Sequence, residues 1–169
     1  MAGSIKSEFA PLLPPGRHLM TVASVSQLCV TPFTTSVTRA PLMARLEVFV
    51  TWLRQNVVIC ELWIDGSFIS EKIDPEDIDL TFLVHGDVYD ALSPALKAEI
   101  KAFEDGERLR PVIHAFPVIT RPMDHPQFRP IEGMVRNMAQ WWSVARGGWI
   151  KGLPVIRLGE TDVGLRILS

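Results

Sequence analysis

Two aspartates separated by a single residue, Asp77 and Asp79, are the side chains in this sequence best suited to chemistry. They open the apolar stretch at residues 77–84, which predicts a β-strand. Successive strand residues point to opposite faces of a sheet, so both carboxylates share one face, roughly 6–7 Å apart. The pair repels itself unless a cation lies between its members, and it can therefore hold divalent metal ions. A strand-start cap, a charge that protects a sheet edge, or a salt bridge is the simpler explanation when two such aspartates occur without another motif.

A glycine and a serine, Gly66 and Ser67, follow a second predicted strand at residues 57–64. Glycine has no Cβ, so its backbone can approach a phosphate closely, and the N–H groups of a following helix start favour an anion. A plain turn is the alternative interpretation. Only the two motifs together indicate a surface that binds phosphate and metal.

At their spacing, with nine residues (68–76) between Ser67 and Asp77, the motifs resemble the core signature of polymerase-β-like nucleotidyltransferases. One position departs from that signature, because Asp65 stands where a hydrophobic residue precedes the glycine. The LPPGRH opening at residues 13–18, the Asp-Gly-Ser-Phe at 65–68 and the Lys-Gly at 151–152 also resemble a family of small bacterial and phage proteins. That family is regarded as nucleotidyltransferase-like.

The resemblance implies that Gly66 and Ser67 contact the triphosphate of an NTP and that Asp77 and Asp79 bind Mg²⁺ or Mn²⁺. Two ions about 4 Å apart would stabilise the attacking and leaving oxygens of an in-line displacement. In the superfamily a third acid, on a neighbouring strand, completes the site, and here that place falls on His114. Histidine is a poor Mg²⁺ ligand. It could act as a general base or be a half-buried side chain that faces a carboxylate.

Several further residues have a functional and a structural interpretation. Glu61, Asp65 or Asp124 could supply the missing oxygen, and nothing in the sequence selects one. Lys72, included among the nucleotide-binding candidates, and Lys151 could meet a triphosphate as point charges, although a solvated surface lysine is the simpler interpretation of each. The tryptophans at 141 and 142 could stack on a base, but core packing fits their helical spacing better.

The leading hypothesis is a minimal nucleotidyltransferase that moves NMP from an NTP to the hydroxyl of an acceptor, here a protein or a small molecule. Small members of the superfamily often act in toxin–antitoxin or phage-defence pairs, which would supply a partner protein. A catalytically degenerate domain that binds nucleotide or protein is the alternative, and His114 is its main support. A structural phage protein is a weaker third hypothesis.

Composition limits these hypotheses. The 169 residues suit one domain, and a net charge of −2 makes non-specific nucleic-acid binding unexpected. No run of residues is apolar enough to span a membrane. Cys29 and Cys60 lie in no metal-binding pattern and are interpreted as two buried thiols rather than a disulfide. We therefore expect a cytoplasmic protein.

The order of the predicted helices and strands around these residues indicates one α+β (α/β-like) domain, a mixed sheet with flanking helices. An irregular arm at residues 1–40, with a short helix near 22–29, is expected to pack on a nucleotidyltransferase-like domain at 41–169. Apolar periodicity predicts helices at 41–56 and 131–145 and two pieces split at Ser93-Pro94. A third strand at 112–119 contains Pro117, which favours either an edge position in the sheet or a strand end. Residues 154–158 and 163–168 are expected to close the domain as a hairpin.

Overall fold

The described part of the computed structural model, residues 9–104, 112–128 and 151–159, forms one α+β domain around a five-stranded mixed sheet. Its elements in chain order are β1 (Gly16–Leu19), α1 (Val22–Cys29), α2 (Arg39–Gln55), β2 (Cys60–Asp65), the 3₁₀ helix η1 (Ser67–Ile69), β3 (Ile78–His85), α3 (Gly86–Ala91), α4 (Pro94–Glu104), β4 (Ile113–Thr120) and β5 (Gly152–Leu158). The strand order is β1-β5-β2-β3-β4. β1 runs parallel to β5 and β3 parallel to β4, while β2 is antiparallel to both β5 and β3.

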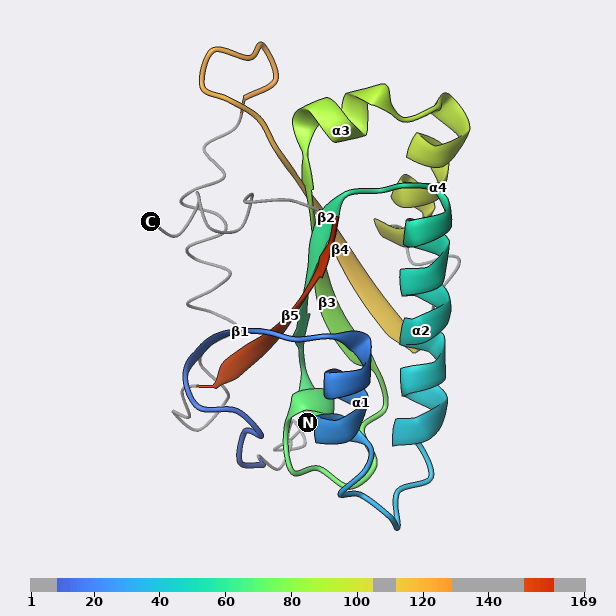
Figure 1. Cartoon of the computed structure of the whole chain (residues 1–169), viewed down its shortest axis with the longest axis vertical. Coiled ribbons are helices and arrows are strands. Elements are labelled where there is room, and N and C mark those ends of the chain that lie inside the picture. The colour runs from blue at the N-terminus through green and yellow to red at the C-terminus, as the bar shows by residue number, and fades with distance from the viewer. Residues whose placement is uncertain (1–8, 105–111, 129–150, 160–169) are drawn as a thin grey trace, which may run out of the picture.

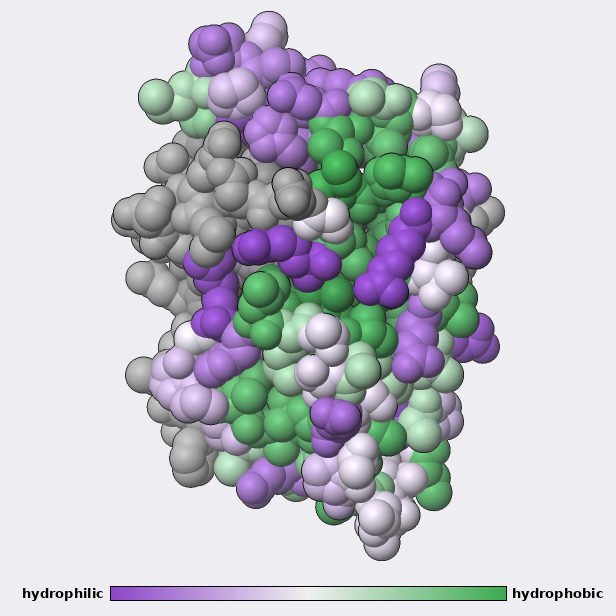
Figure 2. Space-filling model, in the orientation of Figure 1, coloured by the Kyte–Doolittle hydropathy of each residue, from purple (hydrophilic) through white to green (hydrophobic). Residues whose placement is uncertain are grey.

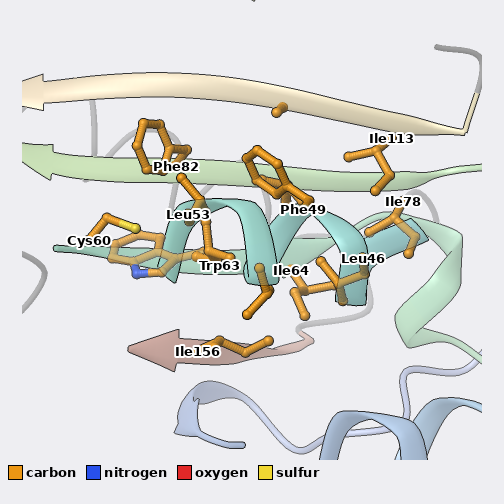
Figure 3. Packing of buried hydrophobic residues seen from close by; sticks show 14 of the residues in the cluster. Leu46, Phe49, Leu53, Cys60, Trp63, Ile64, Ile78, Phe82, Ile113 and Ile156 are labelled. Atoms are coloured by element: carbon orange, nitrogen blue, oxygen red, sulfur yellow. The ribbon is translucent and has the colours of Figure 1, made fainter. Parts of the chain in front are cut away.

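Helices α1, α2 and α4 lie along one face of the sheet (Figure 1). Helix α2 buries Leu46, Phe49 and Leu53, which recur at the spacing of one helical face. These side chains lie over residues of the sheet such as Ile64 and Phe82 (Figure 3). The predicted helix at 41–56 is thus confirmed, and its apolar stripe makes the core that holds the central strands in place.

The opposite face of the sheet is the polar one. In β2 the residues Glu61, Trp63 and Asp65 alternate with apolar residues that face the helices. The register pairs Asp65 with Asp79 and Trp63 with Thr81, so these side chains share the face turned away from α2. Asp65 on β2 therefore lies on the same face of the sheet as Asp79 on β3.

One end of the sheet gathers the residues of interest, because of the strand directions. β2 ends there at Asp65, whereas β3, β4 and β5 begin there. In β4, which forms the sheet edge as Pro117 predicts, His114 is the register partner of Asp79. The lysine at 151 directly precedes β5. Segments far apart in the sequence thus meet at one end of the sheet.

The N-terminal arm is more ordered than expected. The short helix predicted near 22–29 is α1, whose first turn is capped by the Thr21 hydroxyl, which accepts from the Ser24 N–H at 3.0 Å. Irregular structure is wrong for Gly16–Leu19, however, because these residues form β1 at the free side of β5. Pattern alone does not reveal this short strand, since its partner β5 lies at the far end of the chain.

The remaining predictions have mixed outcomes. The split at Ser93-Pro94 is confirmed, with the Ser93 hydroxyl accepting from the Leu96 N–H at 3.2 Å at the start of α4. The first half of the predicted hairpin is β5, which pairs with β1 and β2. Its second half at 163–168, and the predicted helix at 131–145 with its two tryptophans, lie outside the described residues.

Figure 2 shows a band of hydrophobic residues through the middle of the visible face, bordered by hydrophilic ones. Large apolar side chains exposed elsewhere on the described surface include Val57 after α2 and Met123 after β4. Among the described residues, none of the helices combines the length and apolar character needed to cross a membrane.

Candidate metal and phosphate site

Three side chains converge where β3 and β4 begin: Asp77, Asp79 and His114. Each offers one ligand atom, and these atoms all lie within 4.8 Å of one another. The Nδ1 atom of His114 is 3.5 Å from Asp77 Oδ2 and 3.3 Å from Asp79 Oδ1. Each side chain is about one third exposed, so solvent or a ligand can reach the cluster. The two sequence-predicted acids and the histidine therefore form one site.

The position of His114 between the two carboxylates allows two roles for its Nδ1 atom. In the absence of a metal, a protonated His114 can bridge the two carboxylates, which is the structural interpretation of the sequence. With a cation between the acids, its neutral Nδ1 can instead complete a set of two carboxylates and one imidazole. Both states use the same contacts, because a proton and a metal ion compete for one nitrogen.

The carboxylate of Asp79 is the centre of the arrangement. Its Oδ1 faces His114, while its Oδ2 lies against Gly66, where a Cβ would come within 2.5 Å of that oxygen. Burial and the charge of Asp77 raise the pKa of Asp79, and His114 and Lys151 act in the opposite direction. Asp79 is thus held in a partly desolvated position, with His114 on one side and Lys151 acting on it electrostatically.

Gly66 is required at its position for two reasons. Its backbone has φ 79° and ψ −163°, a region essentially restricted to glycine. Any side chain would in addition displace the Asp79 carboxylate. The glycine of the predicted phosphate motif therefore packs directly on the acid of the predicted metal motif. Ser67, which follows it, opens η1, and its carbonyl accepts from the Ser70 hydroxyl at 2.7 Å.

Asp65 and Lys151 form a second charged pair beside the first cluster. Asp65 is only 5% exposed, and its Oδ1 contacts the Nζ of Lys151. Burial raises the pKa of Asp65, and both the lysine and the Gly66 N–H, which donates to this carboxylate, counteract the rise. Solvated surface lysine is therefore the wrong interpretation of Lys151. Among the three acids considered for the missing oxygen, Asp65 is the one next to Asp79.

The other two acids lie elsewhere. Glu61 is buried at the opposite end of β2, where it accepts from Arg157 at 2.9 Å and from the Trp63 indole at 3.1 Å. Asp124 is exposed in the segment after β4, beyond the end of that strand opposite His114. Neither position can complete the cluster.

Lys72 is not brought into the cluster by any contact among the described residues. Its ammonium pairs with Glu76 at 3.5 Å, as expected of a surface lysine. Its backbone carbonyl instead accepts from Arg39. As a phosphate contact, Lys72 has no support in this geometry.

Sequence reasoning missed Arg39, which fixes the loop between the two motifs. This arginine is fully buried in the first turn of α2, and its guanidinium stacks on Phe33 at 3.6 Å. It donates to five backbone carbonyls, those of Cys29, Phe68, Ser70, Lys72 and Ile73. The loop that runs from Gly66 to Asp77 is thereby anchored to α2. In a single sequence, nothing distinguishes this buried arginine from an exposed arginine at the start of a helix.

The N-terminal motif supports the same end of the sheet. The Gly152 N–H donates to the Leu13 carbonyl at 3.1 Å, and a Cβ on Gly152 would collide with the Pro14 carbonyl. The Leu12 N–H in turn donates to the Ile69 carbonyl of η1 at 3.0 Å. The LPPG opening, the Asp-Gly-Ser-Phe segment and Lys151-Gly152 are therefore neighbours in space.

The fold and site together define a class: a single α+β domain with an Asp-Asp-His cluster and a glycine-backed carboxylate at one end of a mixed sheet. The chain belongs to a family of unknown function (DUF6932), whose model matches residues 7–157. Neither a curated protein nor a solved structure matches the chain.

Proposed function

We propose that this protein is a metal-dependent nucleotidyltransferase that transfers NMP from an NTP to the hydroxyl of a protein or small-molecule acceptor. The observation that carries the proposal is the convergence of Asp77, Asp79 and His114, whose ligand atoms lie within 4.8 Å of one another. The close packing of Gly66 on Asp79 adds the backbone approach that a phosphate needs.

The donor set fits a divalent cation. Asp77 and Asp79 supply carboxylate oxygens and His114 supplies Nδ1. Carboxylates suit Mg²⁺ and Mn²⁺, whereas an imidazole favours Mn²⁺ over Mg²⁺, which prefers oxygen ligands. We therefore place Mn²⁺ before Mg²⁺ as the cofactor. Bound there, the ion would neutralise charge that develops on the transferred phosphoryl group.

The reaction is a substitution at the α-phosphorus. The acceptor oxygen forms a bond to that phosphorus as the bond to the bridging oxygen breaks, and pyrophosphate leaves with the bonding electrons. The hydroxyl proton passes to a carboxylate oxygen of the cluster and then to water. The backbone of Gly66 and the start of η1 at Ser67 would lie against the phosphates, because glycine has no Cβ.

A test of transfer uses α-labelled NTPs, Mn²⁺ or Mg²⁺, and candidate hydroxyl acceptors that include the protein itself. The wild type is expected to label an acceptor, and a variant with Asp77→Asn and Asp79→Asn is expected not to. Circular dichroism checks that the variant is folded. Transfer by the variant at the wild-type rate, or absence of transfer by the wild type with all four NTPs, would contradict the proposal.

A catalytically degenerate domain is the second candidate, because His114 stands where the superfamily has an acid. It predicts that NTP and Mn²⁺ raise the melting temperature without any transfer of label. A ligand at 100 times its Kd stabilises a fold by about 2.7 kcal/mol, which such a screen detects readily. A structural phage protein predicts no shift at all.

The partner and compartment follow as parts of the same proposal. A toxin–antitoxin or phage-defence pair would provide a protein acceptor, and copurification of a labelled protein with the chain would identify it. Cys29 and Cys60 are both free and buried, which agrees with a reducing cytoplasm.

A further inference from the structure

We infer that the ammonium of Lys151 takes the place of a second metal ion, so that the site binds one divalent cation rather than two. The inference rests on the proposed function, and it concerns how many metal ions the site binds. It assigns to Lys151 and Asp65 a role that no sequence motif provides.

The first argument is position. Asp65 and Asp79 are register partners on neighbouring strands and point to the same face of the sheet. Lys151 lies against Asp65 and also acts electrostatically on Asp79. The positive charge therefore lies on the Gly66 side of Asp79, whereas Asp77 and His114 lie on its other side.

The second argument is burial. The side chain of Lys151 is 13% exposed and that of Asp65 is 6% exposed, so the pair is largely desolvated. Separating such a pair leaves an uncompensated buried charge, which is strongly unfavourable. A second metal ion would have to displace the ammonium against this cost, while the first site stays open to solvent.

The third argument is anchoring. Lys151 is followed by Gly152, which pairs with Gly16 in the register and is bonded to the Leu13 carbonyl. The Pro14 carbonyl occupies the space that a Cβ on Gly152 would need, so the two segments pack closely here. The lysine is thus delivered to the site by a fixed backbone rather than by a flexible surface segment.

The fourth argument is charge balance. Asp65, Asp77 and Asp79 contribute three negative charges, and Lys151 returns one positive charge. One divalent cation balances the remaining two negative charges, whereas two ions would leave an excess of positive charge before a nucleotide binds. A site that has lost its third metal-binding acid is thereby complete with a single ion.

The experiment is a titration with MnCl₂ alone, read by calorimetry for stoichiometry and by electron paramagnetic resonance for ion–ion coupling. The wild type is expected to bind one Mn²⁺ and to give an uncoupled spectrum. Lys151→Gln should bind two ions, with the coupling expected for ions about 4 Å apart. The double variant D65N/K151Q should return to one ion, because the carboxylate that holds the second is gone.

Controls separate this role from a structural one. Lys72→Gln removes a lysine paired with Glu76 and should leave the stoichiometry at one. Lys151→Met keeps the length of the side chain and should behave as Lys151→Gln, so it serves where the glutamine variant does not fold. A merely structural lysine would change the melting temperature without creating a second Mn²⁺ site.

The outcomes distinguish the inference from the function on which it rests. Two Mn²⁺ ions on the wild type, or one ion on both Lys151 variants, would overturn the inference and leave the metal site of the proposed function intact. No Mn²⁺ on the wild type would overturn both. One ion on the wild type and two coupled ions on a Lys151 variant would support both.

Discussion

Replacing Gly66 with alanine tests the contact between the two motifs directly. The backbone of Gly66 has φ 79° and ψ −163°, and holding alanine there costs about 1–3 kcal/mol. The new Cβ would lie 2.5 Å from Asp79 Oδ2 and 3.2 Å from its Cγ. The carboxylate must move by roughly one ångström to restore an ordinary contact. We therefore expect both a loss of stability and a displaced metal ligand.

The expected size of each effect follows from the geometry. Strain and clash together should lower the free energy of unfolding by about 2–4 kcal/mol. A metal ligand moved by this distance should weaken Mn²⁺ binding by about 10- to 100-fold. Urea denaturation measures the first quantity, and calorimetric titration with MnCl₂ at a temperature where the variant is folded measures the second.

Gly159→Ala is the matched control. Gly159 has φ 76°, and its Cβ would meet Ile59 Cγ1 at 3.0 Å rather than a carboxylate. It follows β5 at the end of the sheet opposite the site, since Leu158 pairs with Cys60. This variant should lose about 1–2 kcal/mol of stability and keep its Mn²⁺ affinity. The reasoning fails if Gly66→Ala binds Mn²⁺ like the wild type, or if Gly159→Ala weakens binding equally.

Four further predictions concern the elements that support the site. Arg39→Ala should lower the free energy of unfolding, measured by urea denaturation, by about 3–5 kcal/mol, because buried carbonyls lose their hydrogen-bond donor. Arg45→Ala, on the exposed side of α2, is the control and should change it by less than about 0.5 kcal/mol. Asp74 accepts from the Val37 N–H at 2.8 Å and from the Ser36 hydroxyl, which hold its pKa below the usual range. The stabilising effect of Asp74 is therefore present at neutral pH and is lost as the pH falls through the lowered pKa. The melting temperatures of wild type and Asp74→Ala should thus converge in thermal melts below about pH 4. Val57, exposed with φ 54°, should be improved by glycine, with a gain of about 1 kcal/mol in thermal melts. Burial raises the pKa of Cys29 to about 12, so a maleimide should leave this thiol unmodified at pH 8 until urea unfolds the chain.

The elements with a strong apolar periodicity could be predicted from the sequence, because burial of one face imposes that spacing on residues close together in the chain. The apolar stripe of α2, the edge position of β4 and the shared face of Asp77 and Asp79 each depend on residues a few positions apart. The expectation that His114 would face a carboxylate also follows from its place on the neighbouring strand. It in fact faces two.

What the sequence did not reveal depends on contacts between distant segments. β1 is a strand only because β5 pairs with it, and its residues carry no alternation of their own. Arg39 resembles a surface residue at the start of a helix until the carbonyls of the Gly66–Asp77 loop surround it. The sequence does not distinguish the environments of Lys72 and Lys151. Lys72 pairs with Glu76 on the surface, whereas Lys151 is largely buried against Asp65.

The two positions that depart from the nucleotidyltransferase signature are neighbours in space. Scored one at a time, an aspartate at 65 and a histidine at 114 each count against the resemblance. In space, both flank Asp79, one as its register partner on β2 and the other as its register partner on β4. Asp65 therefore adds a carboxylate on the β2 side of Asp79, and Lys151 pairs with it. A hydrophobic residue at position 65 would leave that lysine desolvated and without its carboxylate partner.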